Sequence, residues 1–125
     1  MILAKRIKPR SGILRAPVRE HPRHRRFVRG FVCVCAKTHG EECSGRIEAA
    51  HWRSAANSGT GIKPGDPYLA PLCSAHHREQ HQIGQPAFER KYGINLEKIC
   101  RELAMHSPDP DVKAFARDAG NWRTG

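Results

Sequence analysis

Apolar residues occur in short clusters bounded by glycine, proline and other turn residues, and each cluster predicts one short element. Residues 21–30 predict a helix, because proline stands in the first turn and glycine at the end. Residues 46–52 predict a strand and residues 68–72 its return strand. Pro71 in the return strand implies a sheet edge or a break, since proline has no N–H to donate.

Further helices are predicted toward the C-terminus, over residues 73–83, 86–92, 96–105 and 112–119. Asn95 is well placed to cap the third of these helices. Cys100 shares that helix's apolar face, so we expect it to be a buried thiol and not a metal ligand.

The composition indicates one small domain with tails. Of 125 residues, 38% are hydrophobic and 6% aromatic, which is a thin supply for a core. Small chains with thin cores often depend on a bound metal ion for stability. We expect a flexible basic arm over residues 1–21, a folded domain over 22–106 and a C-terminal tail, with a short helix, over 107–125.

The positive charge is concentrated near the start of the chain. The formal net charge is +10, and residues 1–30 contain ten Lys and Arg residues but only one acidic residue. Charge of one sign over such a stretch favours an arm that follows DNA phosphates over a merely solvated tail. Arginines in the predicted first helix are expected to contact nucleic acid, namely Arg23, Arg25, Arg26 and Arg29.

The chain has five cysteines, and the apolar run at residues 1–4 is far too short for a signal peptide. No stretch approaches the ~18 apolar residues of a membrane span. We therefore expect a cytoplasmic protein without a membrane partner. In that reducing setting, clustered Cys and His residues hold metal more often than they form disulfides.

One predicted metal site combines two segments of the chain. Cys73 and His76 stand three residues apart at a helix start, a spacing typical of half a structural zinc site. Cys43, with either Cys33 or Cys35, supplies the other half; the sequence leaves the choice between these two open. Such a closed thiolate and imidazole set is what structural zinc requires.

A second site is predicted from three other histidines. His77 and His81 are four residues apart, so both imidazoles leave the same face of a helix and can share one ion. His51 ends the strand expected opposite this helix. A neutral imidazole can take a proton from water near neutral pH, so this arrangement indicates hydrolysis.

These stretches together resemble the HNH, or ββα-metal, endonucleases, and most of all their phage and prophage recombination-endonuclease branch. The matching stretches are residues 47–53 (IEAAHWR), 61–66 (GIKPGD), 72–84 (LCSAHHREQHQIG) and 88–94 (FERKYGI). The resemblance implies an α+β fold: a small zinc-stapled, treble-clef-like ββα-metal domain with flanking short helices and the basic arm.

The resemblance also implies roles for individual residues. His51 would be the general base, while His77 and His81 would hold a catalytic Mg²⁺, Mn²⁺ or Zn²⁺ ion. Asp66 stands near the position of the middle polar residue that orients the base. Further roles are expected in binding the DNA backbone, for Arg53 as a phosphate clamp and for Lys63 in the glycine-rich loop.

The sequence departs from the family pattern in three places. Ala50 stands where many members have a third metal ligand, the middle asparagine has no clear equivalent, and residues 36–42 are inserted between the cysteines. Ala50 favours an alternative, a non-catalytic zinc module that binds nucleic acid. A structural or assembly protein is the third reading. One such site nicks one strand, so a homodimer is a further expectation for double-strand cleavage.

Overall fold

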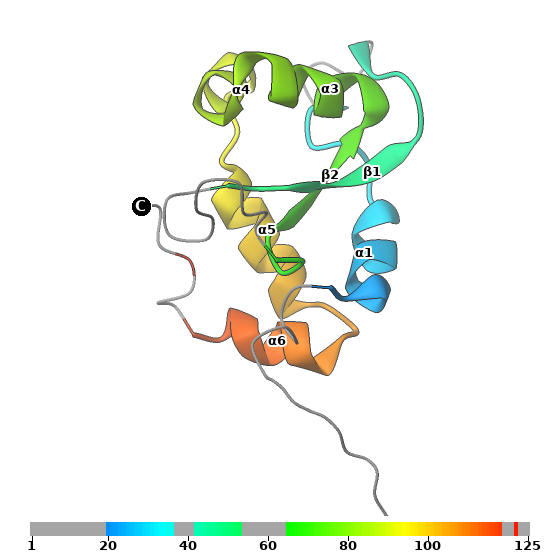
Figure 1. The fold of residues 1–125 in the computed structure, drawn as a ribbon, viewed down its shortest axis with the longest axis vertical. Helices are drawn as coiled ribbons and strands as arrows, with labels where there is room; N and C mark the ends of the chain where they lie inside the picture. Colours follow the sequence, from blue (N-terminus) through cyan, green and yellow to red (C-terminus); the bar gives the residue numbers. More distant parts are fainter. Residues whose placement is uncertain (1–19, 37–41, 54–64, 119–121, 123–125) are drawn as a thin grey trace, which may run out of the picture.

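The computed structural model describes residues 20–36, 42–53, 65–118 and 122. Within these residues the protein is α+β, with one two-stranded sheet and five α-helices (Figure 1). The elements, in chain order, are α1 (Pro22–Arg29), β1 (Ile47–His51), β2 (Leu69–Cys73), α3 (Ser74–Ile83), α4 (Gln85–Tyr92), α5 (Leu96–Met105) and α6 (Pro110–Ala116).

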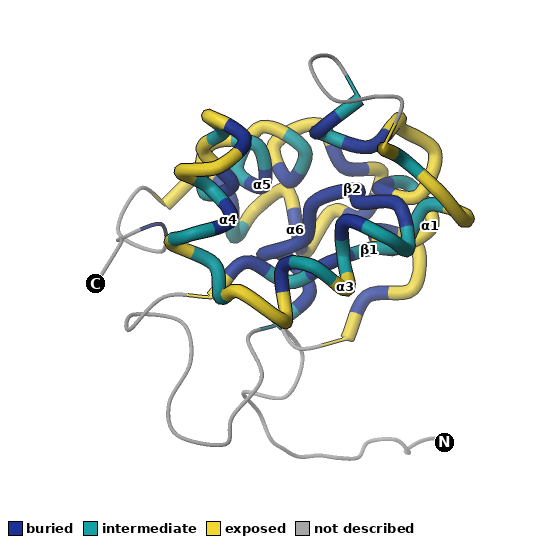
Figure 2. Tube along the Cα trace, turned by 90° about the horizontal axis from the view of Figure 1, so that it is seen from above, coloured by how far each residue is buried: buried dark blue, intermediate teal, exposed yellow. Residues whose placement is uncertain are grey.

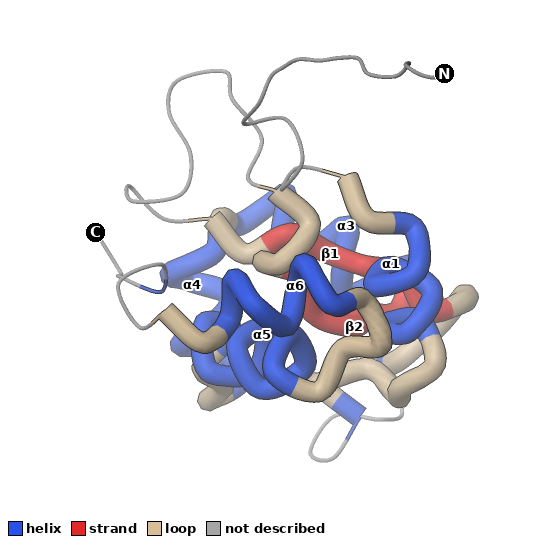
Figure 3. Tube along the Cα trace, turned by 90° about the horizontal axis from the view of Figure 1, so that it is seen from below, coloured by secondary structure: helices blue, strands red, loops and turns tan. Residues whose placement is uncertain are grey.

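The two strands form an antiparallel hairpin at the centre of the molecule, surrounded by the helices (Figure 3). The register pairs Ile47 with Cys73 and His51 with Leu69. All of β2 is buried, whereas β1 is mostly half-buried. Pro71 lies inside β2, where a two-stranded sheet leaves one side unpaired, and its carbonyl accepts a hydrogen bond from the Val34 N–H at 3.0 Å.

Predicted helices 21–30, 86–92 and 96–105 agree with α1, α4 and α5 to within a residue or so. The Asn95 side chain caps α5 by accepting from the Lys98 N–H at 3.1 Å. Two other helices differ from their predicted bounds. Cys73 ends β2 and caps α3 with its thiol, so that helix begins at Ser74. Asp109 caps α6, which therefore starts at Pro110 and not at Val112. The same helix ends at Ala116, before its predicted end at residue 119.

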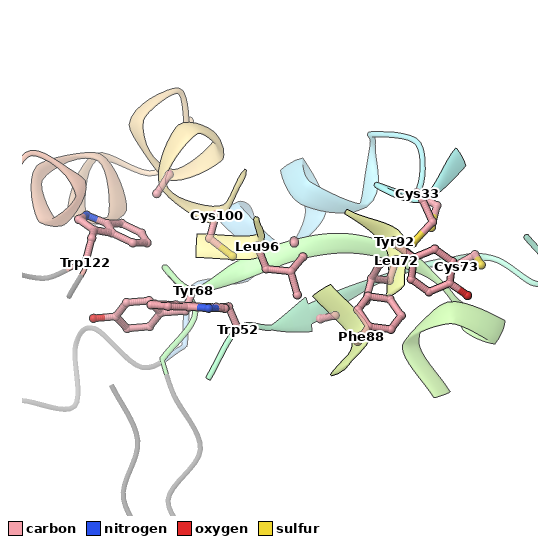
Figure 4. Close-up of a cluster of buried hydrophobic side chains, with 14 of the residues drawn as sticks. Cys33, Trp52, Tyr68, Leu72, Cys73, Phe88, Tyr92, Leu96, Cys100 and Trp122 are labelled. Atoms are coloured by element: carbon pink, nitrogen blue, oxygen red, sulfur yellow. The ribbon is translucent and has the colours of Figure 1, made fainter. Parts of the chain in front are cut away.

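The core follows β2 and extends from the cysteines at one end to an aromatic group at the other (Figure 4). Tyr68 lies at the aromatic end, with ring centroids 5.8 Å from Trp52 and 5.2 Å from Trp122. Cys100 is fully buried on α5, as predicted, and burial raises the pKa of its thiol. Val112 of α6 also belongs to this core, so α6 packs against the same interior as the hairpin.

Figure 2 shows the same arrangement by burial, with dark-blue segments of β2 lying between the helices. Two expectations from the sequence fall outside the described residues: positions 1–19 of the basic arm expected over 1–21, and Lys63 in the loop before Asp66. His21, the last residue of that expected arm, is described and buried. In the part of the chain that is described, no helix combines the length and the hydrophobicity needed to cross a membrane.

Candidate metal centre and histidine pocket

Four side chains converge where β2 meets α3. Their ligand atoms all lie within 4.8 Å of one another, and they belong to Cys33, Cys43, Cys73 and His76. His76 Nδ1 lies 3.6 Å from the Sγ atoms of both Cys33 and Cys43. It lies 3.1 Å from Cys73 Sγ. Tetrahedral bonds of zinc to sulfur and nitrogen would place such atoms about 3.5 Å apart, so the donor set and its spacing fit a metal ion.

Gly45 brings the Cys43 segment against the start of α3. Its φ is +83°, and a Cβ atom here would lie 2.6 Å from the Ser74 Cβ, closer than real Cβ contacts allow. The Ser44 carbonyl then accepts a hydrogen bond from the Ala75 N–H at 3.1 Å. Gly45, in a conformation and a space that other residues do not tolerate, therefore lets the Cys43 segment approach α3.

The start of α3 supplies the other two donors. Cys73 Sγ caps the helix by accepting from the His76 N–H at 3.4 Å. The His76 ring packs edge-on against Tyr92, with centroids 5.0 Å apart. Its Nε2 atom is buried and has no hydrogen-bond partner among the residues that the structure describes, and Glu42 approaches it to 3.9 Å. Nδ1 is thus the nitrogen directed at the thiols.

The structure favours Cys33 over Cys35 as the first ligand. Both thiols are buried, but only Cys33 belongs to the group of four donors. A hydrogen bond from Cys35 lowers the pKa of Cys33 to about 4, although burial opposes this change. The same hydrogen bond, assisted by burial, raises the pKa of Cys35. Cys33 is therefore suited to bind as a thiolate, with Cys35 as its neutral donor.

A second group of side chains lines an open pocket of about 340 Å³ beside α3. The lining residues are His51, Arg53, His77, Gln80, His81, Gly84 and Gln85. The pocket therefore gathers the predicted base, the predicted phosphate clamp and the two predicted ligands of a catalytic ion. In contrast to the cysteine cluster, its histidines are half-buried or exposed.

His77 and His81 are positioned to share one ion. Their Nε2 atoms lie 3.3 Å apart, close to the spacing of about 3.3 Å that two imidazoles have on a tetrahedral zinc. His77 Nδ1 lies 2.7 Å from Glu48 Oε1, which fixes the ring so that Nε2 points into the pocket. Ala50 is buried against the core and offers no ligand, so the described residues supply two imidazole donors here.

The predicted base and its predicted orienting residue lie in contact. His51 Nε2 is 3.3 Å from Asp66 Oδ1. Asp66 is fully buried, and it also accepts hydrogen bonds from Arg25 Nε at 2.7 Å and from the His21 N–H at 2.6 Å. Burial raises the pKa of the Asp66 carboxyl, but these three partners outweigh burial and hold that pKa well below its ordinary range.

The state of Asp66 determines the tautomer of His51. An ionised carboxylate can only accept, so His51 Nε2 carries the hydrogen and donates it. In the neutral ring, Nδ1 then has the free lone pair. His51 is half-buried, which leaves that nitrogen able to act as a base toward the pocket.

The predicted DNA-binding arginines of α1 divide into two groups. Arg25 donates to both Asp66 oxygens, at 2.7 and 3.0 Å, and therefore supports His51. Arg23, Arg26 and Arg29 are exposed.

Two residues with evident roles were missed from the sequence, Glu48 and Gln85. Glu48 is the one charged residue in β1, and that pattern alone could have indicated it. Gln85 pairs with the backbone of Arg53 through two 2.8 Å hydrogen bonds. No sequence signal could reveal this contact, because the two residues are 32 positions apart.

Residues 11–107 match the model of a family of proteins of unknown function (DUF968), and the chain belongs to this family. It is also similar to the uncharacterized protein YdfU of Escherichia coli (strain K12), with 37% identity over 82 residues. The matched part covers 64% of this chain but only 23% of YdfU, so the chain spans less than a quarter of that relative. No solved structure matches the chain.

Proposed function

We propose that this protein is a metal-dependent DNA endonuclease of the HNH type, which hydrolyses phosphodiester bonds, in phage or prophage DNA recombination and processing. The observation that carries the proposal is the pocket in which His51, His77 and His81 meet. A candidate base and two imidazoles spaced for one ion line the same open cavity. A buried structural histidine would need neither the shared pocket nor access from solvent.

The arrangement of the elements supports the same proposal. Strands β1 and β2 form a hairpin that leads directly into α3, the order of a ββα-metal unit. The cluster of three cysteines and one histidine fits the structural zinc of such a domain. This four-donor set, in which Cys43 alone is half-buried and the others are buried, would hold the hairpin, the segment before it and α3 together without taking part in chemistry.

Each pocket side chain then has a defined task. His51 Nδ1 takes a proton from the attacking water, while Asp66 keeps the ring in position and stabilises its charged form. Arg53, whose backbone Gln85 holds, pairs with the phosphate. When bound by His77 and His81, a divalent cation supplies charge that stabilises the phosphate and the leaving 3′ oxygen.

A non-catalytic zinc module that binds nucleic acid is the second candidate. The buried Ala50 supports it, because the position before His51 provides no third ligand. Against it stand the hydrogen bonds that orient His51 and His77, since a decayed site has no need to keep either ring in one orientation.

A nicking assay on supercoiled plasmid with Mg²⁺, Mn²⁺ or Zn²⁺ separates the two candidates. We expect His51→Ala to lower the cleavage rate by about 10²- to 10⁴-fold, the usual contribution of a general base. DNA affinity and the circular dichroism spectrum should stay unchanged. His106→Ala is the matched control, because His106 is exposed at the C-terminus of α5 and lines no part of this pocket. Cleavage unchanged by His51→Ala would refute the mechanism.

A further inference from the structure

A second polar hollow, of about 660 Å³, opens beside β1 and is separate from the histidine pocket in its lining. Its lining residues are Arg25, Arg29, Arg46, Ile47, Glu48 and Ala49. Three arginines therefore line one cavity, two from α1 and one from the segment before β1. Arg46 comes from the segment just before β1 and was not singled out by the sequence.

Two of the three arginines are available for a ligand. Arg25 is committed to Asp66 through two hydrogen bonds. Arg29 and Arg46 are exposed, and among the described residues no carboxylate forms an ion pair with either side chain. The hollow thus has two arginines in its lining whose charges no described carboxylate pairs.

Glu48 is the acidic residue of the hollow, and both of its oxygens are engaged. Oε1 contacts His77 Nδ1 at 2.7 Å, and Oε2 accepts from the Ser74 hydroxyl at 3.0 Å. The Glu48 charge is therefore directed toward α3, and Arg29 and Arg46 dominate the surface that a ligand would meet.

We propose that this hollow binds a backbone phosphate of duplex DNA, distinct from the phosphate that is cleaved. The inference rests on the proposed function for the identity of the substrate. Arginine forks match the two oxygens of a phosphodiester, and such contacts fix the register of the duplex without reading its sequence. Arg29 and Arg46 are accordingly positioning residues, and they do not touch the reacting atoms.

The strand sets the distance between the two sites. Ile47 lines the hollow and His51 lines the histidine pocket, and four residue steps of an antiparallel strand span about 14 Å. One DNA strand carries a phosphate for every 3.4 Å or so of helix axis. The two phosphates should therefore be about four nucleotides apart, on one side of the cleavage point.

The first test measures binding of a fluorescent 20-base-pair duplex by anisotropy over a range of salt concentrations. The double variant Arg29→Gln/Arg46→Gln should weaken binding about tenfold or more and reduce the salt slope by about 0.9, the value for one lost phosphate. The control, Lys113→Gln/Arg117→Gln, removes the same charge from exposed positions of α6 that line neither site. Equal effects of the two double variants would overturn the inference.

The second test uses duplexes shortened on one side of a mapped cleavage point. Wild type and the Arg29→Gln/Arg46→Gln variant should converge in rate once fewer than about four nucleotides remain on that side. A rate deficit that persists at every length would refute the assigned position. If no DNA is cleaved at all, the proposed nuclease function fails, whereas the anisotropy comparison still decides whether the hollow binds phosphate.

Discussion

Two faces of α3 hold their histidines in contrasting environments. At its start, Cys73 and His76 are buried and face two further thiols. One residue further on, His77 turns into a solvent-open pocket with His81. A step of about 100° around the helix is enough to send adjacent imidazoles to different sites. Burial and the number of neighbouring donors, more than the identity of the residue, therefore distinguish the environments of these two histidines.

The supports of the two sites differ as well. In the cysteine cluster the four donors themselves complete a closed shell, so a metal ion would join three segments directly. The histidine pocket depends on two residues outside its lining, because Glu48 accepts a hydrogen bond from His77 and Asp66 accepts one from His51. The first site should respond to a change by losing its fold, and the second by losing affinity or rate.

Replacing a cysteine ligand should have the largest effect. We expect Cys73→Ser to lose zinc and to destabilise the fold by several kcal/mol, because structural zinc contributes directly to folding. Cys100→Ser, at a buried thiol outside the cluster, should retain zinc. Metal content by mass spectrometry and urea unfolding measure both. Equal loss of zinc in the two variants would place Cys100 in the site and remove the contrast between the two faces of α3.

Acidification should weaken the support of the histidine pocket through His24. This residue lies fully buried in α1, which also carries Arg25, the partner of Asp66. Burial lowers the pKa of His24 from 6.5 to about 4. Between pH 6.5 and 4, His24 therefore binds a proton in the unfolded chain but not in the folded chain. The stability from the neutral ring is complete above pH 6.5 and is lost as the pH falls toward 4, by up to about 3 kcal/mol.

Acid also protonates the zinc ligands, so the effect of His24 on stability is measured against a variant that lacks this histidine. Urea unfolding of wild type and His24→Gln, both with excess zinc, should show a steeper loss between pH 6.5 and 4 in wild type. A direct NMR titration of the His24 ring should show no protonation above pH 5 in the folded protein. Parallel stability curves would mean that His24 is not a neutral buried support.

The smallest expected effect concerns Glu48, which orients His77 without binding the ion. Glu48→Gln should weaken binding of Mn²⁺ to the histidine pocket by about 10- to 100-fold, as for other residues that orient metal ligands. Zinc content should stay unchanged. Glu102→Gln, on exposed α5 surface, provides the control. Isothermal titration measures both variants, and a simultaneous loss of zinc would show that the two sites are not independent.

Local features of the sequence predicted much of the fold. Proline, glycine and asparagine marked the ends of α1, α4 and α5, because their effects act within one or two turns. The start of α3 was misplaced because a thiol at Cys73, and not a usual capping residue, ends the strand and begins the helix. The start of α6 lies two residues before its predicted position, because Asp109 caps the helix within a run of prolines and aspartates that is typical of a break.

The sequence by itself determined which residue types stand at ligand spacing on α3, since i, i+3 and i, i+4 positions meet wherever a helix forms. Only the tertiary structure decided between Cys33 and Cys35, because a difference of two positions in a turn depends on where the chain is held. It also decided that Asp66 meets His51 and that Glu48 meets His77. Those pairs join segments 15 and 29 residues apart, and no local pattern encodes such distances.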